Sequence, residues 1–291
     1  MTRSDLELAN ALADAAGSVI RPLFRAHGET ETKADNSAVT EADRGAEAAM
    51  RKLIEERCPG DGIIGEEYGI TREGASRQWV LDPIDGTQSF VAGRPIFGTL
   101  IALMQDGWPV LGVIDQPING ERWVGRIGEG TTLNGKPVKT RACAGVEGMS
   151  LATTSPHAFD ADQSDAWLNL VINAYPKRPF PIYGGDCYNY AMLASGHVDC
   201  VMEAGLKIHD YAALVPVDEG AGGLMSDWQG NPLDAGSDGT VIALGDPARI
   251  EDVLAAMGSS ELAPHVREAS APQTSVLPSS GGFKFPLPGS D

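Results

Sequence analysis

The sequence is poor in paired cysteines, in long apolar runs and in positive charge. Its four cysteines are scattered, and no two of them have the C-x-x-C spacing of a zinc knuckle or a redox dithiol. No apolar run approaches the roughly 18 residues of a membrane span, and the N-terminus lacks the apolar stretch of a secretory signal. These absences predict a cytoplasmic protein with reduced thiols and no membrane partner.

Positive charge is scarce, because 22 basic residues face 40 acidic ones and the formal net charge is -18. Such a chain repels the phosphate backbone of nucleic acids, so no nucleic-acid partner is expected. It also repels a small anionic substrate. If the protein handles phosphate, another component must neutralise the charge, and bound divalent cations are the natural candidates.

The 291 residues, 42% of them hydrophobic, are enough for one large or two ordinary domains. Apolar residues at helical spacing predict helices over 5–25 and from about residue 40 to the Cys58-Pro59-Gly60 stop. Short β-type runs between residues 63 and 140 predict an antiparallel sheet laid against these helices. Its expected strands are 79–81, 99–103, 110–114 and 121–124.

The second half of the chain alternates between strand and helix patterns, which indicates layered α/β structure. The expected strands are 150–153, 181–183, 198–202 and 240–244, and the expected helices are 164–175, 188–195, 210–220 and 250–257. Gly196 is expected to end the second of these helices, and Pro216 to kink the third. The expected units are two subdomains, 1–145 and 146–262, and a Pro-, Ser- and Gly-rich disordered tail, 263–291.

The segment W-V-L-D-P-I-D-G-T at residues 79–87 suggests chemistry. An apolar strand runs into Asp82 and Asp85, and buried carboxylates cost free energy unless a cation neutralises them. Mg²⁺ prefers such oxygen ligands. Pro83 stiffens the turn and can leave the Ile84 carbonyl facing the same ion, while residues 87–91 are expected to form a short helix whose N–H groups hold a phosphate. The alternative interpretation is an Asp-Gly turn between strands.

Two further acidic positions accompany this segment. Glu66 and Glu67 follow an apolar pair and are flanked by glycines. Adjacent side chains of extended structure face opposite ways, so one glutamate can face a metal ion and the other a second ion or solvent. Asp210 follows His209 at the start of the expected 210–220 helix. Taken alone, the glutamates are equally typical of a charged loop, and Asp210 of an ordinary N-terminal cap.

Together these motifs resemble the inositol monophosphatase superfamily, in the same order and over about residues 1–260. The resemblance rests on G-E-E at 65–67, D-P-I-D-G-T at 82–87, the late Asp210, Lys33 and the T-x-x-D at 40–43. It implies a magnesium-dependent, often lithium-sensitive phosphomonoesterase that is commonly a homodimer. It also implies a fold of the α/β (α+β) class with α-β-α-β-α layers.

The resemblance further implies ligands for about two to three Mg²⁺ ions. The ligands of the first ion would be Glu66, Asp82 and the Ile84 carbonyl. The ligands of the second would be Asp82, Asp85 and Asp210. Glu67 would reach a third, weaker ion.

The same resemblance implies catalytic roles. Thr87 together with Glu66 would activate the attacking water, and Asp43 would support Thr87 from behind. The backbone N–H groups of Gly86 and Thr87 would grip the phosphate. The substrate is therefore expected to be a small phosphorylated molecule.

Substrate choice depends on the leaving group. Two further acidic residues are expected to lie near the leaving group. Asp186 follows Gly184-Gly185 where sugar and inositol phosphatases have a small residue, and Glu203 matches a position that contacts the leaving alcohol. Acids there favour a cation. With the runs at 95–103 and 113–117, the segment 185–188 resembles the histidinol-phosphate phosphatase branch. The expected reaction is hydrolysis of L-histidinol phosphate, in histidine biosynthesis.

Other interpretations stay open at this point. If Asp186 only caps the 188–195 helix, an inositol or other polyol or sugar phosphate becomes the expected substrate. A bisphosphate substrate would require a basic cluster that the sequence does not show. A non-catalytic subunit would be expected to lack one of Glu66, Asp82, Asp85, Thr87 and Asp210, which are all present. His209, where the family commonly has Trp, and the unexpected charge of Asp218 leave the substrate open.

Overall fold

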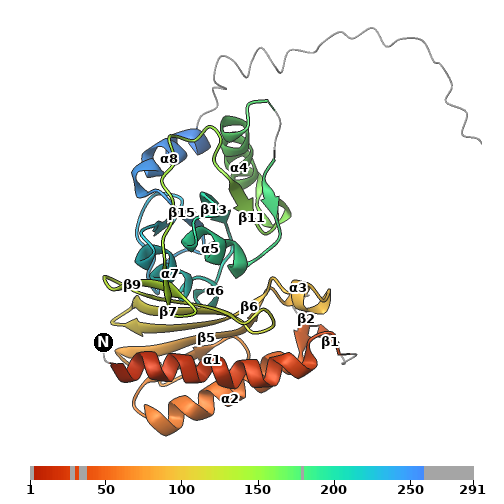
Figure 1. Ribbon diagram of the computed structural model, residues 1–291, viewed down its shortest axis with the longest axis vertical. Helices are drawn as coiled ribbons and strands as arrows, with labels where there is room; N and C mark the ends of the chain where they lie inside the picture. The colour runs from red at the N-terminus through yellow and green to blue at the C-terminus, as the bar shows by residue number, and fades with distance from the viewer. Residues whose placement is uncertain (1–2, 27–29, 33–37, 178–179, 259–291) are drawn as a thin grey trace, which may run out of the picture.

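The computed structural model describes residues 3–26, 30–32, 38–177 and 180–258. Helices and sheets alternate in the order α-β-α-β-α (Figure 1). This is the layered α/β class that the sequence predicts. Lys33 and the 263–291 tail lie outside the described residues.

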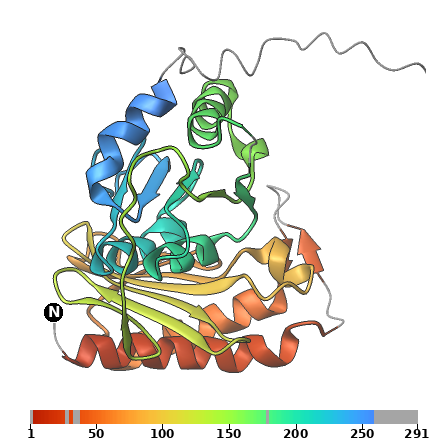
Figure 2. The same cartoon turned by 45° about the horizontal axis from the view of Figure 1, so that its top comes forward.

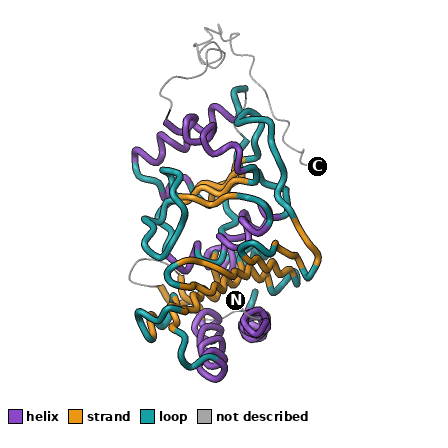
Figure 3. The backbone as a smooth tube through the Cα atoms, turned by 90° about the vertical axis from the view of Figure 1, so that its left-hand side faces the viewer, coloured by secondary structure: helices purple, strands orange, loops and turns teal. Residues whose placement is uncertain are grey.

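The first layer consists of α1 (Arg3–Leu23) and α2 (Glu41–Arg57), which pack against each other and against the large sheet (Figure 3). Both predicted helices are thereby confirmed. The apolar stripe of α1 is buried, and its members are Leu8, Ala9, Leu12, Ala13, Ala16 and Ile20. A two-stranded ribbon of β1 (Thr30–Thr32) and β2 (Ala38–Thr40) lies between the helices in the chain.

The large sheet has eight strands in the order β10-β9-β8-β7-β6-β5-β3-β4. Their bounds are β3 (Gly62–Gly65), β4 (Gly69–Thr71), β5 (Arg77–Asp85), β6 (Gly98–Gln105), β7 (Trp108–Gln116), β8 (Glu121–Arg126), β9 (Gly130–Leu133) and β10 (Lys136–Val138). All neighbours are antiparallel except β3 and β5, which are parallel. The four predicted strands lie inside β5 to β8. The strands that the sequence pattern missed are short and mostly peripheral, so their apolar periodicity is weak.

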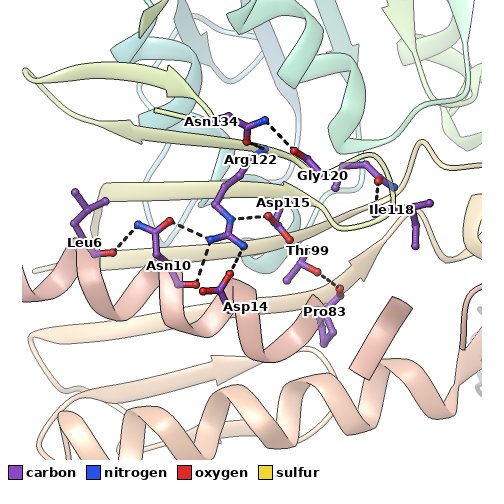
Figure 4. Close-up of polar contacts among 11 residues, drawn as sticks. Leu6, Asn10, Asp14, Pro83, Thr99, Asp115, Ile118, Gly120, Arg122 and Asn134 are labelled. Carbon is purple, nitrogen blue, oxygen red and sulfur yellow. Dashed lines mark hydrogen bonds and ion pairs between the residues drawn. The ribbon is translucent and has the colours of Figure 1, made fainter. Parts of the chain in front are cut away.

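Arg122 on β8 ties α1 to this sheet (Figure 4). Its guanidinium donates to Asp115 Oδ1 on β7 at 2.6 Å and to Asp14 Oδ1 on α1 at 2.8 Å. Thr99 on β6 pairs with Asp115 in the ladder, and its hydroxyl donates to the Pro83 carbonyl at 2.8 Å. These contacts therefore link α1 through β8, β7 and β6 to Pro83, near the end of β5.

The central layer contains α5 (Cys187–Ala194), α6 (Ile208–Tyr211) and α7 (Leu214–Gly220), which lie between the two sheets (Figures 1 and 2). α7 approaches β7 and β8 closely because two strand positions have no side chain. A Cβ on Gly112 would lie 1.9 Å from the Ala213 carbonyl oxygen, and one on Gly125 would lie 2.2 Å from that of Pro216. α7 is therefore held against the large sheet, and α6, which precedes it, contacts β5 and β6.

The prediction of one kinked helix over residues 210–220 is wrong. The chain forms two helices, α6 and α7, with Ala212 and Ala213 between them. Pro216 lies in the first turn of α7, where a missing N–H leaves no helical hydrogen bond unmade. Pro216 thus fits within the first turn of α7, and the break in the predicted helix lies before α7.

The small sheet has five strands in the order β12-β11-β13-β15-β14, covered on its outer face by α4 (Ala161–Ala174) and α8 (Ile250–Gly258). Its strands are β11 (Leu151–Thr153), β12 (Ile182–Tyr183), β13 (Cys200–Glu203), β14 (Leu224–Ser226) and β15 (Val241–Leu244). β11 runs parallel to β12 and β13, whereas β15 is antiparallel to β13 and β14. Apart from the 210–220 helix, the predicted strands and helices of this half are present, whereas β14 was not predicted.

The proposed boundary near residue 145 stays a prediction. The strands of the large sheet all precede it and those of the small sheet all follow it, yet α7 packs on the large sheet. Within the described ranges, no helix has both the length and the apolar character needed to cross a membrane.

Candidate active site

The carboxyl end of β5 leaves the regular ladder at the aspartate motif. Asp82 pairs with Leu100 and Asp85 with Gly98, and the register is irregular between the two aspartates. Pro83 has no N–H with which to pair. The Ile84 N–H turns back instead onto Asp82 Oδ1, at 3.0 Å. This irregular turn lets both aspartates present oxygens to one point.

Asp210 joins them from α6. One carboxylate oxygen from each of Asp82, Asp85 and Asp210 lies within 4.8 Å of the other two. The Oδ2 atom of Asp210 also accepts the Lys207 N–H at 2.6 Å. His209 lies alongside, with Nε2 3.5 Å from Asp210 Oδ1. Two segments more than 120 residues apart in the sequence thus build one acidic cluster.

Burial is the largest cause that raises the pKa of each of these three acids above its ordinary value. Neighbouring negative charge adds to it: Glu66 raises the pKa of Asp82, and Asp186 raises that of Asp85. Three ionised carboxylates so close together are stable only when a cation shares the space between them. The donor set is all oxygen, which fits a hard ion such as Mg²⁺.

Glu66 and Glu67 follow β3 and have different neighbours. Glu66 is close enough to raise the pKa of both Asp82 and Asp210. The Oε2 atom of Glu67 lies 3.6 Å from Arg44 Nε, and the Glu67 N–H donates to Glu47 Oε2 at 2.7 Å. Glu66 therefore faces the acidic cluster, and Glu67 faces α2.

Asp43, in the first turn of α2, is buried with 2% exposure. Its charge also raises the pKa of Asp82, which places it on the α2 side of the cluster.

The short helix predicted over residues 87–91 is confirmed as α3 (Thr87–Val91). Gly86 precedes it with φ 83° and ψ 41°, a left-handed conformation that glycine adopts without strain. The Thr87 hydroxyl donates to the Ile84 carbonyl at 3.0 Å. A Cβ on Gly86 would lie 2.7 Å from Asp186 Oδ2, so glycine is also required for the close approach of that carboxylate.

Asp186 precedes α5 with a strained backbone. Its φ is 46° and its ψ -134°, and it follows Gly184 and Gly185 with φ 77° and 118°. Glycine would adopt this conformation at no cost, whereas aspartate is strained in it. Asp186 occupies the N-terminal cap position of α5, but its side chain makes no capping hydrogen bond to that helix. Its Oδ2 atom accepts from Ser89 Oγ at 3.4 Å instead, because the carboxylate lies against Gly86 and α3.

Glu203 ends β13 and is 5% exposed. Its Oε1 atom accepts the Thr154 N–H at 2.6 Å, and burial raises the pKa of its carboxyl to about 7. Glu203, Asp186, Asp85 and Asp210 line one cavity of about 170 Å³, whose apolar walls include Leu206 and Leu214. The acidic cluster and the two predicted leaving-group acids therefore share one space.

A larger cavity of about 510 Å³ lies between α1 and β8, away from this cluster. Two of its arginines are bonded to acids of the same wall, Arg122 to Asp115 and Arg126 to Glu129. Charge is largely matched there, so the smaller cavity is the better candidate for chemistry although it is not the largest.

Three residues at the site were missed in the sequence. The Cys187 N–H donates to Asp85 Oδ2 at 2.6 Å. Ser89 donates to Asp186, and Thr154 Oγ1 accepts the Asp186 N–H at 3.1 Å. One available signal was that Thr154 directly follows a predicted strand, since ligand sites of α/β folds lie at the carboxyl ends of strands.

The model of the inositol monophosphatase family matches residues 1–261. This chain belongs to that family. It is accordingly a hydrolase of phosphoric monoesters, which sets aside the interpretation as a non-catalytic subunit. Enzymes of the inositol monophosphatase family are metal-dependent, and the cluster of Asp82, Asp85 and Asp210 can hold a metal ion.

Relatives within the family differ in the activity that their names give. The chloroplastic bifunctional phosphatase IMPL2 of Arabidopsis thaliana is 52% identical over 223 residues, which are 76% of this chain and 63% of the plant protein. The histidinol-phosphatase of Chlorobaculum parvum is 36% identical over 88% of this chain and 98% of its own length. A structure of an inositol monophosphatase from Zymomonas mobilis has a TM-score of 0.80 and 51% identity, covering 87% of this chain and 97% of that one. The match spans less than two thirds of the plant protein.

Proposed function

We propose that this protein is a Mg²⁺-dependent phosphatase that hydrolyses L-histidinol phosphate to L-histidinol and phosphate, in histidine biosynthesis. The observation that carries the proposal is Asp186, a charged residue kept in a conformation that suits glycine, beside the cavity that also contains Glu203. A relative named histidinol-phosphatase, matched over 98% of its length, supports the same substrate.

Metal binding is assigned to the acidic cluster. The ligands of the proposed Mg²⁺ ions are Glu66, Asp82, the Ile84 carbonyl, Asp85 and Asp210, with Glu67 nearest a third ion. When bound, these ions supply Lewis acidity, lower the pKa of the attacking water and neutralise the phosphate charge. The raised pKa of three adjacent aspartates, of which Asp82 is buried and the other two are half-buried, supports this assignment.

The other roles fall to residues around that cluster. Thr87 together with Glu66 activates the attacking water, and Asp43 supports Thr87. The N–H groups of Gly86 and Thr87, at the start of α3, hold the phosphate. Gly185 gives Asp186 the room to turn towards the leaving group, since its φ of 118° is open to glycine.

Asp186 and Glu203 select the leaving group. Histidinol carries an ammonium group and an imidazole, and charge-assisted hydrogen bonds from these groups satisfy carboxylates that are otherwise costly to bury. A neutral polyol cannot compensate the Asp186 charge in the same way. The strain at Asp186 is then the cost of holding an acid at this place.

The second candidate substrate is an inositol or other polyol phosphate. Its support is the 51% identity to the structure of an inositol monophosphatase from Zymomonas mobilis. The acidic cluster and α3 would serve this reaction equally, so only the leaving-group side of the cavity distinguishes the two.

The deciding experiment compares phosphate release from L-histidinol phosphate and myo-inositol 1-phosphate with Mg²⁺. We expect kcat/KM for the histidinol ester to be higher by about a hundredfold, which is about 2.7 kcal/mol of transition-state binding. Asp186→Ala should remove most of this preference through KM, whereas the exposed control Asp162→Ala should keep it. A preference for the inositol ester in the wild type would replace the proposed substrate.

Lithium inhibition, a homodimer and a cytoplasmic location complete the proposal, as the resemblance to the family implies. Lithium is expected to inhibit by replacing the second Mg²⁺. Activity that is unchanged at high millimolar lithium, in a titration at fixed Mg²⁺, would contradict this part of the proposal alone.

A further inference from the structure

The strained turn at Asp186 is held by hydrogen bonds from three separate elements. The Asp186 N–H donates to Thr154 Oγ1 at 3.1 Å, and its carboxylate accepts from Ser89 Oγ at 3.4 Å. The next N–H, that of Cys187, donates to Asp85 Oδ2 at 2.6 Å. A conformation that costs free energy persists only where its surroundings over-determine it. These bonds therefore decide where the Asp186 carboxylate lies.

Thr154 differs from the other two partners because it contacts both leaving-group acids. It directly follows β11, and its own N–H donates to Glu203 Oε1 at 2.6 Å. Its hydroxyl oxygen accepts from the Asp186 N–H, and its carbonyl accepts the Gly184 N–H at 2.9 Å. One residue thus joins the end of β13, which carries Glu203, to the loop that carries Asp186.

We infer that Thr154 is a positioning residue that fixes Asp186 and Glu203 relative to each other and thereby sets leaving-group specificity. The inference rests on the proposed function in one respect, namely that these two acids select the leaving group. Thr154 acts through the two carboxylates, and it takes no part in the attack on phosphorus.

The hydroxyl group is the part of Thr154 that this role requires. Valine keeps the shape, the β-branch and the N–H to Glu203, but it leaves the Asp186 N–H without its acceptor and removes the side-chain hydrogen bond to Glu203. A buried donor that loses its partner is costly, so the loop would relax from the strained conformation and carry the carboxylate away from Gly86. Serine keeps an acceptor oxygen at the same place and should restore the turn.

The test is a double-mutant cycle that measures a ratio of kcat/KM values, histidinol phosphate over inositol 1-phosphate. Thr154→Val should move the ratio about tenfold in the same direction as Asp186→Ala, mainly through KM. Thr154→Ser should restore it. Adding Thr154→Val to Asp186→Ala should change the ratio by less than Thr154→Val does in the wild type. Hydrolysis of p-nitrophenyl phosphate, whose leaving group has no ammonium group, should fall less than hydrolysis of histidinol phosphate does.

The matched control is Thr131→Val, since the buried Thr131 hydroxyl donates to the Val217 carbonyl at 2.6 Å far from Asp186. It should lower stability comparably and leave the ratio unchanged. The inference is overturned if Thr131→Val shifts the ratio equally, if serine does not rescue, or if the effects of Thr154→Val and Asp186→Ala simply add. A wild type that prefers the inositol ester would refute the proposed function, while the cycle would still decide whether Thr154 acts through Asp186.

Discussion

The protein buries acidic side chains in two different surroundings, one in the small sheet and one at the site. Asp199, next to β13, receives two hydrogen bonds from Arg141, at 2.6 and 2.7 Å, and one from the Ser150 N–H at 2.8 Å. Asp82 and Asp85 have other carboxylates as their charged neighbours. Both kinds of acid are buried, so the difference lies in what faces them.

The pKa values follow that difference. Burial acts to raise the pKa of Asp199, but its hydrogen bonds with Arg141 and Ser150 outweigh burial and lower the pKa below 3.8. At the site, burial and neighbouring charge act together and raise the pKa. An acid that is paired with a basic side chain, which we call matched, contributes to the stability of the fold. A cluster of acids without such partners, which we call unmatched, lowers stability and can bind a cation.

Asp218 is an exception that tests this division. It is fully buried in α7, and within the described part of the chain neither of its carboxylate oxygens has a hydrogen-bond partner. Burial raises the pKa of its carboxyl well above 3.8. It does not line the 170 Å³ cavity, so we expect it to lower the stability of the fold without contributing to catalysis.

The largest expected effect comes from the unmatched acids. Asp85→Asn should lower kcat by about a thousandfold or more, because it removes charge that holds the cation. Its thermal midpoint without metal should not fall, since the substitution also removes repulsion between carboxylates. Added Mg²⁺ should raise the midpoint less than it does in the wild type. A near-wild-type rate would contradict the metal assignment, and the exposed Asp162→Asn serves as control.

A smaller effect, on stability alone, is expected for the pair of Arg141 and Asp199. Arg141→Met should lower the free energy of unfolding at pH 7 by about 2 kcal/mol, because Asp199 is then buried without a cation. The folded pKa of Asp199 is lowered, so its contribution is present above pH 3.8 and is lost as pH falls through the folded pKa. The difference between variant and wild type should therefore shrink in acid.

Denaturant titrations at several pH values measure this difference. Lys136→Met, at an exposed position of β10, should be nearly neutral. If Arg141→Met lowered kcat without lowering stability, the division between structural and catalytic acids would be wrong.

The smallest effect is expected for Asp218. Asp218→Val should raise the free energy of unfolding at pH 8 by about 1 kcal/mol, because it removes a buried carboxyl without a partner and keeps a similar volume. The pKa of Asp218 is raised in the folded state, so this carboxyl does not destabilise the wild type below pH 3.8, where it is protonated in both states. As pH rises above 3.8 towards the folded pKa, the wild type loses stability. The advantage of the variant should grow with pH.

Thermal midpoints between pH 4 and 8 measure this trend, with activity towards p-nitrophenyl phosphate as the check on the site. A variant that is less stable at every pH would show that Asp218 has a favourable partner, such as a buried water, and would end its status as an exception.

Much of the fold followed from local pattern. The helices α1 and α2 were predictable because each buries one periodic apolar face, and the strands β5 to β8 because short apolar runs are bounded by turn residues. The helix at 87–91 was predictable from a glycine and a threonine after the aspartate motif. The break between α6 and α7 was not, because it depends on where Pro216 falls within a turn, which the apolar pattern does not report.

The candidate site divides in the same way. D-P-I-D-G-T and G-E-E are contiguous motifs, and their carboxylates were identified without the fold. Thr154 and Ser89 carry common hydroxyl side chains that gain their meaning only next to Asp186. The conformation of Asp186 itself was unpredictable, since φ 46° combined with ψ -134° lies outside the regions that residues other than glycine normally adopt.

The sequence by itself determined the layered α/β class, the family and the presence of an acidic motif after a buried strand. Tertiary structure decided that Asp210 completes the cluster, that Asp186 faces Gly86 and not its own helix, and that Thr154 joins the two leaving-group acids. The physical reason is the distance along the chain over which each effect acts. Periodicity, turn chemistry and motif spacing act over a few residues, whereas the pKa of a carboxylate and the strain of a turn depend on groups brought together from distant parts of the chain.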